Sequence, residues 1–144
     1  MNYFKDYNFE IPFDLLYIPS KGIFYSGKTP YFIIQYLTAK EESILTSPSL
    51  SESGMASKMV IDSVVINKEF DIGEMLVGDR NAVALFLRST SYGDSFPLKY
   101  SCPKCQSEQE LDFKLSSLES KDVDEVPNEK GLFSFVLPKS KVVV

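Results

Sequence analysis

The chain contains two cysteines, Cys102 and Cys105, and no histidine. They form the motif Cys-Pro-Lys-Cys, which is typical of a tight turn that presents two sulfurs to one metal ion. A structural zinc ion needs four ligands in a tetrahedron, so one chain supplies half of a thiolate site. Zinc is therefore expected only if it is shared between chains. Catalytic arrangements built on histidine are excluded from the start.

The composition favours one folded domain over residues 1–144. The chain is 44% hydrophobic and 24% charged, which is ordinary for a globular protein that buries its own core. Its net charge of -5 argues against a surface built to bind nucleic acid and favours a protein partner. No secretory signal pattern is present, and no run approaches the roughly 20 apolar residues of a membrane helix. The sequence thus predicts a protein of a reducing cytosol with no membrane partner.

Residues 1–37 are expected to form an aromatic-rich arm and strands. Residues 31–37 are aromatic and β-branched, which predicts a strand covered on both faces. Residues 15–25 look like an extended arm broken by a turn at 19–22. This arm either closes the sheet of its own domain or lies on a neighbouring subunit. In the second alternative, three aromatic residues of the arm would contact the partner: Tyr17, Phe24 and Tyr25.

Residues 38–93 are expected to be helical. Thr38 and Glu41 fit a capping box at the start of a short helix that ends near Thr46. The polar run 47–54 is interpreted as a loop, and apolar residues at helical spacing predict a second helix over 55–67. A third helix is predicted over 80–91, with Asp79 as its N-cap and Gly93 at its C-terminus. Its apolar residues lie nearly all round, which is typical of a buried central helix.

Two arginines, Arg80 and Arg88, lie about two turns apart on the third predicted helix. They either pair with nearby carboxylates or bind an acidic partner. Three carboxylates near helix starts, Asp71, Glu74 and Asp79, are the only acid and base candidates for an enzyme, and such residues are usually caps. The sequence predicts no catalytic activity.

Residues 94–115 are expected to form a β-hairpin with the cysteine motif at its turn. Four interpretations of the cysteines stay open: a metal site completed by a second copy, one completed by another protein, a pair of reduced thiols, or a redox dithiol. The redox interpretation is the weakest, because no helix begins at the first cysteine to lower its pKa.

The remaining residues are interpreted as an acidic loop over 116–130 and a C-terminal strand over 131–144. The chain ends on exposed β-formers, which indicates a longer chain or pairing with a sheet edge, its own or another chain's. The fold class predicted from all segments is α+β. It is a small mixed domain with N-terminal strands, two or three central helices, a CxxC hairpin and a C-terminal strand.

Several segments, taken in order, resemble the baseplate hub protein family of T-even-type contractile-tailed phages. They are Leu16–Gly22, Leu37–Leu45, Leu76–Ala82, Ser91–Gly93 and the CPKC turn. The resemblance implies a structural or assembly protein without enzymatic activity. It implies a place in the virion tail baseplate, and host cytoplasm as the location during assembly. Its partners would be other hub or tail proteins, with self-association through the cysteine hairpin as a further expectation.

A second hypothesis is a zinc-knuckle adaptor that binds nucleic acid or another protein. It requires a basic face and a complete metal site. Lysines at 99, 104 and 114 are too few to make such a face.

Overall fold

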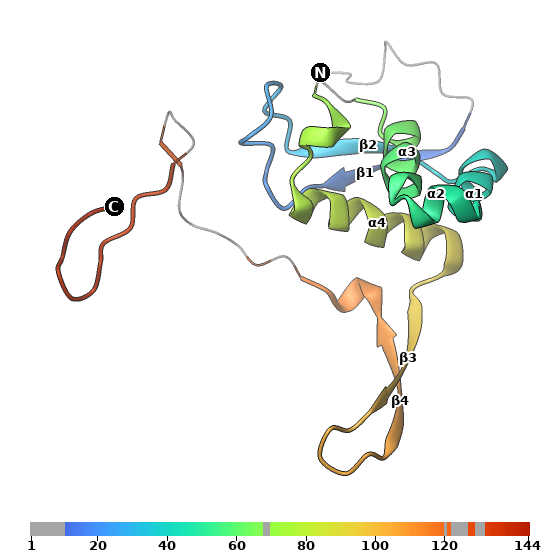
Figure 1. Ribbon diagram of the computed structural model, residues 1–144. Helices are drawn as coiled ribbons and strands as arrows, with labels where there is room; N and C mark the ends of the chain where they lie inside the picture. Colours follow the sequence, from blue (N-terminus) through green and yellow to red (C-terminus); the bar gives the residue numbers. More distant parts are fainter. Residues whose placement is uncertain (1–10, 68–69, 120, 122–126, 129–131) are drawn as a thin grey trace.

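Figure 1 shows the computed structural model of the chain, which describes residues 11–67, 70–119, 121, 127–128 and 132–144. Two antiparallel two-stranded sheets and a group of helices make an α+β fold, as predicted. The strands are β1 (Phe13–Tyr17), β2 (Tyr31–Gln35), β3 (Ser95–Ser101) and β4 (Glu108–Lys114). The helices are α1 (Ala39–Leu45), α2 (Pro48–Glu52), α3 (Met55–Val64) and α4 (Val77–Tyr92), with 3-10 turns η1 (Ile72–Glu74) and η2 (Leu115–Ser117).

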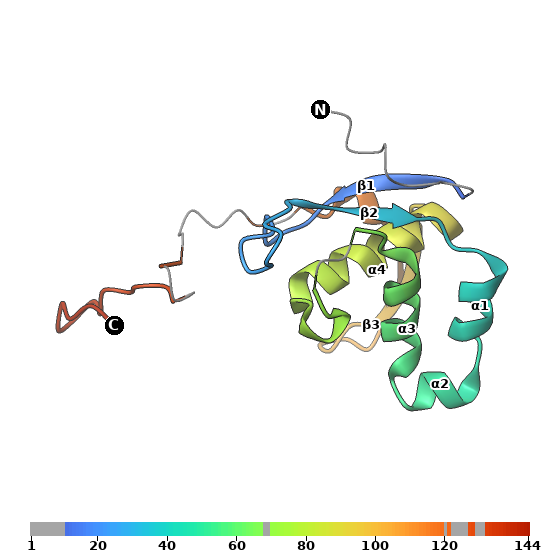
Figure 2. The same cartoon turned by 90° about the horizontal axis from the view of Figure 1, so that it is seen from above.

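The first hairpin, β1 and β2, lies against α3 and α4 (Figure 2). Leu15 is opposite Ile33 in its register. All three central residues of β2 are buried, so the prediction that both faces of this strand are covered is confirmed. A bridge between Ile34 and Val65 adds the end of α3 to the sheet edge. The strand portion of the arm over 15–25 therefore pairs within its own sheet, and its contact with a neighbouring subunit stays a prediction.

The helix α1 begins at the capping box predicted from the sequence. The Thr38 side chain accepts from the backbone, and the Glu41 carboxylate accepts from Thr38 N at 3.0 Å. Glu41 is only 1% exposed, and it also accepts a hydrogen bond of 2.6 Å from Ser63 Oγ. Burial would raise the pKa of Glu41, but the hydrogen bonds from Ser63 and Thr38 outweigh it and lower the pKa to about 2.

Three helix predictions need correction. The run 47–54 contains a helix, α2, because Pro48 occupies its first turn, where proline needs no hydrogen-bond partner for its nitrogen. The helix α3 ends at Val64 rather than near 67, since the chain turns extended at Val65 to meet β2. The helix α4 begins at Val77, not at Arg80.

Asp79 is consequently inside the first turn of α4 and is not its N-cap, which is Leu76. The helix end at Gly93 is confirmed, with φ of 87° at that residue. Only one face of α4 is buried, carrying Asp79, Val83 and Leu87, while Leu85 is 38% exposed. The prediction of a helix buried all round is therefore wrong.

The hydrophobic core lies between the first hairpin and the helices. Its buried residues come from β2, the loop after β1, α3, η1 and α4: Ile18, Tyr25, Phe32, Ile34, Val60, Ile61, Val64, Val65, Ile72, Met75, Val83 and Leu87. No residue of the second hairpin belongs to this cluster. The second hairpin instead extends from the end of α4 (Figure 1).

The C-terminal residues fold back on themselves instead of forming the single strand predicted over 131–144. Phe135 and Val144 exchange two backbone hydrogen bonds of 2.7 and 2.8 Å, and Leu137 N donates to Val142 O at 2.9 Å. The turn η2 occupies the start of the predicted acidic loop, and much of that loop lies outside the described residues. Residues 1–10 of the aromatic arm also lie outside them. Within the described ranges, none of the helices has both the length and the apolar character needed to cross a bilayer.

Candidate interaction site

The second hairpin has one apolar face and one charged face. Its register places Phe96 opposite Phe113 and Leu98 opposite Leu111. Because side chains alternate along a strand, these four residues and Tyr100 share one face, which we call the apolar hairpin face. The opposite face carries the ion pair between Lys99 and Glu110, with 2.6 Å between nitrogen and oxygen.

The apolar hairpin face is exposed. Four of its members are at least 38% exposed: Phe96, Leu98, Tyr100 and Leu111. A two-stranded hairpin by itself is marginally stable in water, and an exposed apolar face of this kind is a candidate interaction surface. The alternation of apolar and polar residues in this segment is visible in the sequence. It did not indicate that the apolar side lacks cover from the chain itself.

The base of the hairpin is fastened to the end of α4. Ser116 donates two hydrogen bonds of 2.7 Å to the carboxylate of Asp94, from its amide and its hydroxyl. The hydrogen bond from the Ser116 hydroxyl is the main reason that the pKa of Asp94 lies below its ordinary value. Leu115 N also donates to Asp94 O at 2.9 Å. The hairpin therefore leaves the domain from a fixed base.

Arg88 contributes to the same junction. Its guanidinium donates to Gly93 O at 2.9 Å and lies over the rings of Tyr92 and Phe96, 5.5 and 5.6 Å from their centroids. Arg80 lies at the other end of α4 and donates to Met75 O at 3.4 Å. The two arginines thus contact opposite ends of the helix and do not form one binding site.

The turn of the hairpin brings the two cysteines together. Cys102 N donates to Ser107 O at 3.0 Å, and Gln106 N donates to Cys102 O at 2.8 Å. Cys105 Sγ lies 3.1 Å from Ser107 Oγ. Hydrogen bonds from the Ser107 hydroxyl, the Ser107 amide and the Cys102 thiol lower the pKa of Cys105.

The turn does not hold a complete metal site. No group of three or more His, Cys, Asp or Glu side chains suited to a metal ion occurs among the residues whose placement is described. Cys102 and Cys105 are both free thiols, the first half-buried and the second exposed. They could supply two of four ligands to a zinc ion.

The three aromatic residues predicted to contact a partner lie in different surroundings. Tyr17 is 72% exposed and packs edge-on against Tyr31. Phe24 is 45% exposed, and its ring centroid lies 6.3 Å from that of Phe133 in the C-terminal segment. Tyr25 is buried, and its ring stacks on Phe70 at 4.3 Å. In this fold Tyr25 therefore serves the core, and Tyr17 and Phe24 are the two that a partner can reach.

Tyr25 and Asp79 belong to a buried network that closes the loop after β1. Asp79 is 0% exposed and accepts hydrogen bonds from Tyr25 Oη at 2.6 Å, Ser20 Oγ at 2.6 Å and Ser20 N at 3.0 Å. Burial first, and the hydrogen bond to Asp79 second, raise the pKa of Tyr25 well above its ordinary value. Every oxygen of the Asp79 carboxylate thus has a structural partner. The sequence pattern could not reveal this network, because Asp79 is more than 50 residues away from Ser20 and Tyr25.

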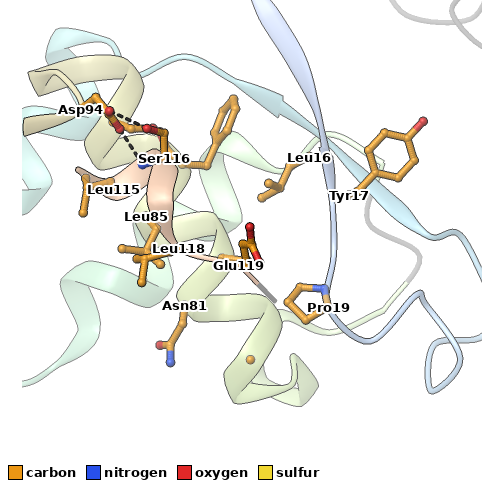
Figure 3. A pocket seen from close by; sticks show the side chains of 14 residues that line it. Leu16, Tyr17, Pro19, Asn81, Leu85, Asp94, Leu115, Ser116, Leu118 and Glu119 are labelled. Atoms are coloured by element: carbon orange, nitrogen blue, oxygen red, sulfur yellow. Dashed lines mark hydrogen bonds between the residues drawn. The ribbon is translucent and has the colours of Figure 1, made fainter. Parts of the chain in front are cut away.

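A shallow pocket of about 490 Å3 lies between β1, α4 and η2 (Figure 3). Its lining is mainly apolar and includes Leu16, Leu85, Leu115 and Leu118, with the Asp94 and Ser116 pair at one side. Sequence reasoning missed it, because three separate elements supply its walls.

The three carboxylates considered for catalysis lie in different surroundings. Asp71 caps η1 by accepting from Gly73 N at 2.6 Å, Glu74 is exposed, and Asp79 is held in the buried network. Asp71 and Asp79 therefore have structural roles, which their hydrogen bonds define.

Comparison with known proteins gives one match. A family model described as "T4 bacteriophage base plate protein" matches residues 26–141. The matched region runs from the loop after β1, through all four helices and the cysteine hairpin, into the C-terminal segment. A search of the curated proteins and a search of the solved structures found no match.

Proposed function

Because this chain belongs to the family of T4 bacteriophage base plate proteins, we propose that it is a non-enzymatic structural or assembly subunit of the hub of a contractile-tail baseplate. Membership confirms the resemblance noted in the sequence at the level of a T4-type base plate protein, and it places the protein in the tail baseplate. The hub position, and assembly in the host cytoplasm before the particle is complete, are parts of the proposal.

The exposed apolar hairpin face carries this proposal. A protein that acts by fitting against other proteins needs apolar side chains that its own core does not use. The hairpin offers these next to the end of α4, where the hydrogen bonds from Ser116 to Asp94 close its base. We therefore propose this face as the main contact with another baseplate protein, and Tyr17, Phe24 and Arg80 as additional contacts.

The adaptor hypothesis, with nucleic acid as partner, has little support. The charged face of the hairpin carries three carboxylates, at 108, 110 and 112, against the lysines at 99 and 114. One of these lysines is already paired with Glu110. Such a face would repel a phosphate backbone.

The test replaces two apolar residues of the hairpin by charged ones, Leu98→Lys and Leu111→Lys. Both side chains are exposed, so the domain should fold as before, with an unchanged circular dichroism spectrum and a melting temperature within a few degrees. A matched control reverses the ion pair on the other face, Lys99→Glu with Glu110→Lys.

The readout is the amount of tagged chain that co-purifies with identified baseplate proteins from infected cells. We expect the apolar-face variant to be lost from these complexes and the reversed-pair variant to be kept. Retention of both variants at the level of the unchanged chain would contradict the proposed interface.

A further inference from the structure

The tip of the second hairpin holds two thiols on a turn that is shaped for metal binding but is not completed by its own chain. We propose that two copies of this protein meet at their hairpin tips and share one zinc ion, bound by Cys102 and Cys105 of each copy. This inference gives the cysteine turn one partner, a second copy, and leaves the apolar hairpin face to the baseplate partner proposed above.

The geometry of the turn supports two ligands from each chain. The hydrogen bonds from Gln106 N to Cys102 O and from Cys102 N to Ser107 O close the turn around both cysteines. Cys105 Sγ lies 3.1 Å from Ser107 Oγ, and a hydroxyl beside the sulfur can orient and stabilise a thiolate that binds a metal.

The backbone of the turn is held in an unusual conformation next to the second cysteine. Gln106, directly after the second cysteine, has φ of 57°, in the left-handed region that favours glycine. A residue with a side chain is strained there unless its surroundings require that conformation. The chain keeps the tight turn around its two thiols in spite of this strain.

The ligand count leads to a second copy. Residues 1–144 contain no cysteine or histidine other than these two cysteines, so we assign the two further soft ligands to a second chain. A two-fold axis through the metal presents the same cysteine pair twice, which completes a tetrahedron of four thiolates. Four thiolates around one zinc ion carry an excess of negative charge. Lys104, which lies between the two cysteines, would supply a positive charge from each copy.

The hairpin is free to make this contact. It stands away from the helices, and every described residue from 103 to 112 is exposed (Figure 1). Nothing in the described part of the chain covers the tip.

The test uses the purified full-length chain, loaded with zinc and then treated with a chelator. We expect about one zinc for every two chains. The molar mass in solution should be twice that of one chain with zinc, and should fall to that of one chain after chelation. Two differently tagged copies should co-purify with zinc and separate without it. Cobalt in place of zinc should give the visible spectrum of a tetrahedral, thiolate-bound ion.

Two variants of the turn sharpen the test. Cys102→Ser should lose the cobalt spectrum and the doubled mass, because each copy then offers one thiolate. Gln106→Gly is the matched control: it relieves the left-handed strain without touching a ligand, so zinc content and mass should be kept. Circular dichroism of both variants checks that the domain is folded.

Three results would overturn the inference: no bound zinc, one zinc for each monomeric chain, or a dimer that survives both chelation and Cys102→Ser. All are measured on the isolated protein, so they leave the baseplate assignment untouched. A chain that binds zinc and dimerises but never joins baseplate complexes would instead contradict the proposed function alone.

Discussion

Tyr25 Oη donates a hydrogen bond of 2.6 Å to the buried carboxylate of Asp79, joining the loop after β1 to the first turn of α4. The same hydroxyl accepts from Leu76 N at 3.1 Å, so it connects the loop to the residue that precedes the helix. Removing either partner leaves buried polar groups without hydrogen bonds, which is more costly than the loss of the bond alone.

We expect Tyr25→Phe to lower the free energy of unfolding by about 1–3 kcal/mol, because Asp79 and Leu76 N each lose a partner. Chemical denaturation measures this change. Tyr17→Phe is the control, since that ring is exposed, and it should change stability by less than about 0.5 kcal/mol. Equal effects of the two substitutions would show that the network adds nothing to stability.

Asp79→Asn should destabilise the domain by a similar amount, because the amide cannot accept at both of its positions. In the double variant with Tyr25→Phe, the loss should be smaller than the sum of the single losses by about 0.5 kcal/mol or more, as expected for residues in direct contact. Strict additivity in this double-mutant cycle would mean that the two residues are not coupled.

Gly22 occupies a position that only glycine can fill. Its φ is 71°, and an added Cβ would lie 2.2 Å from Thr29 O. Gly22→Ala should therefore cost at least about 2 kcal/mol in thermal or chemical unfolding. Gly54 is the matched control, with φ of 70° and open space around it. Gly54→Ala should cost only the backbone strain, about 1 kcal/mol.

We expect the folded domain to lose stability in acid because Glu41 becomes protonated. Its pKa is lowered from 4.5 to about 2 in the folded protein, so its ionised form stabilises the fold above pH 4.5. This contribution to stability is lost as the pH falls from 4.5 to about 2, the pKa of Glu41 in the folded protein. In Glu41→Gln this part of the pH dependence should be absent, as measured by urea unfolding at several pH values. An unchanged acid profile in the variant would rule out Glu41 as its source.

We expect Asp94 to stabilise the base of the second hairpin and to have no effect on the stability of the core. In Asp94→Ala, Ser116 loses both hydrogen bonds, so the amide of Ser116 should exchange with solvent faster while the amides of β2 keep their protection. Ser117→Ala removes only the hydrogen bond to Lys114 O and is the control. If exchange at the base is the same in both variants, Asp94 does not fasten the hairpin.

The sequence was informative where a structure depends on neighbouring residues. The capping box at Thr38 and Glu41, the glycine that ends α4 at Gly93, and the cysteine turn are each set by a few consecutive residues, and all three are confirmed. The predicted start of α4 is wrong because it depends on residues that are distant in the sequence. Asp79 has the side chain of an N-cap, but its partners, Ser20 and Tyr25, lie far away in the chain.

By itself, the sequence determined the class of fold, the resemblance to base plate proteins and the fact that one chain holds only two thiolate ligands, since residue types and their order settle these points. The tertiary structure alone decided which apolar residues remain uncovered. Burial depends on which elements meet in space, and the hairpin carrying Leu98 and Leu111 extends from the end of α4, outside the buried core, where both side chains stay exposed.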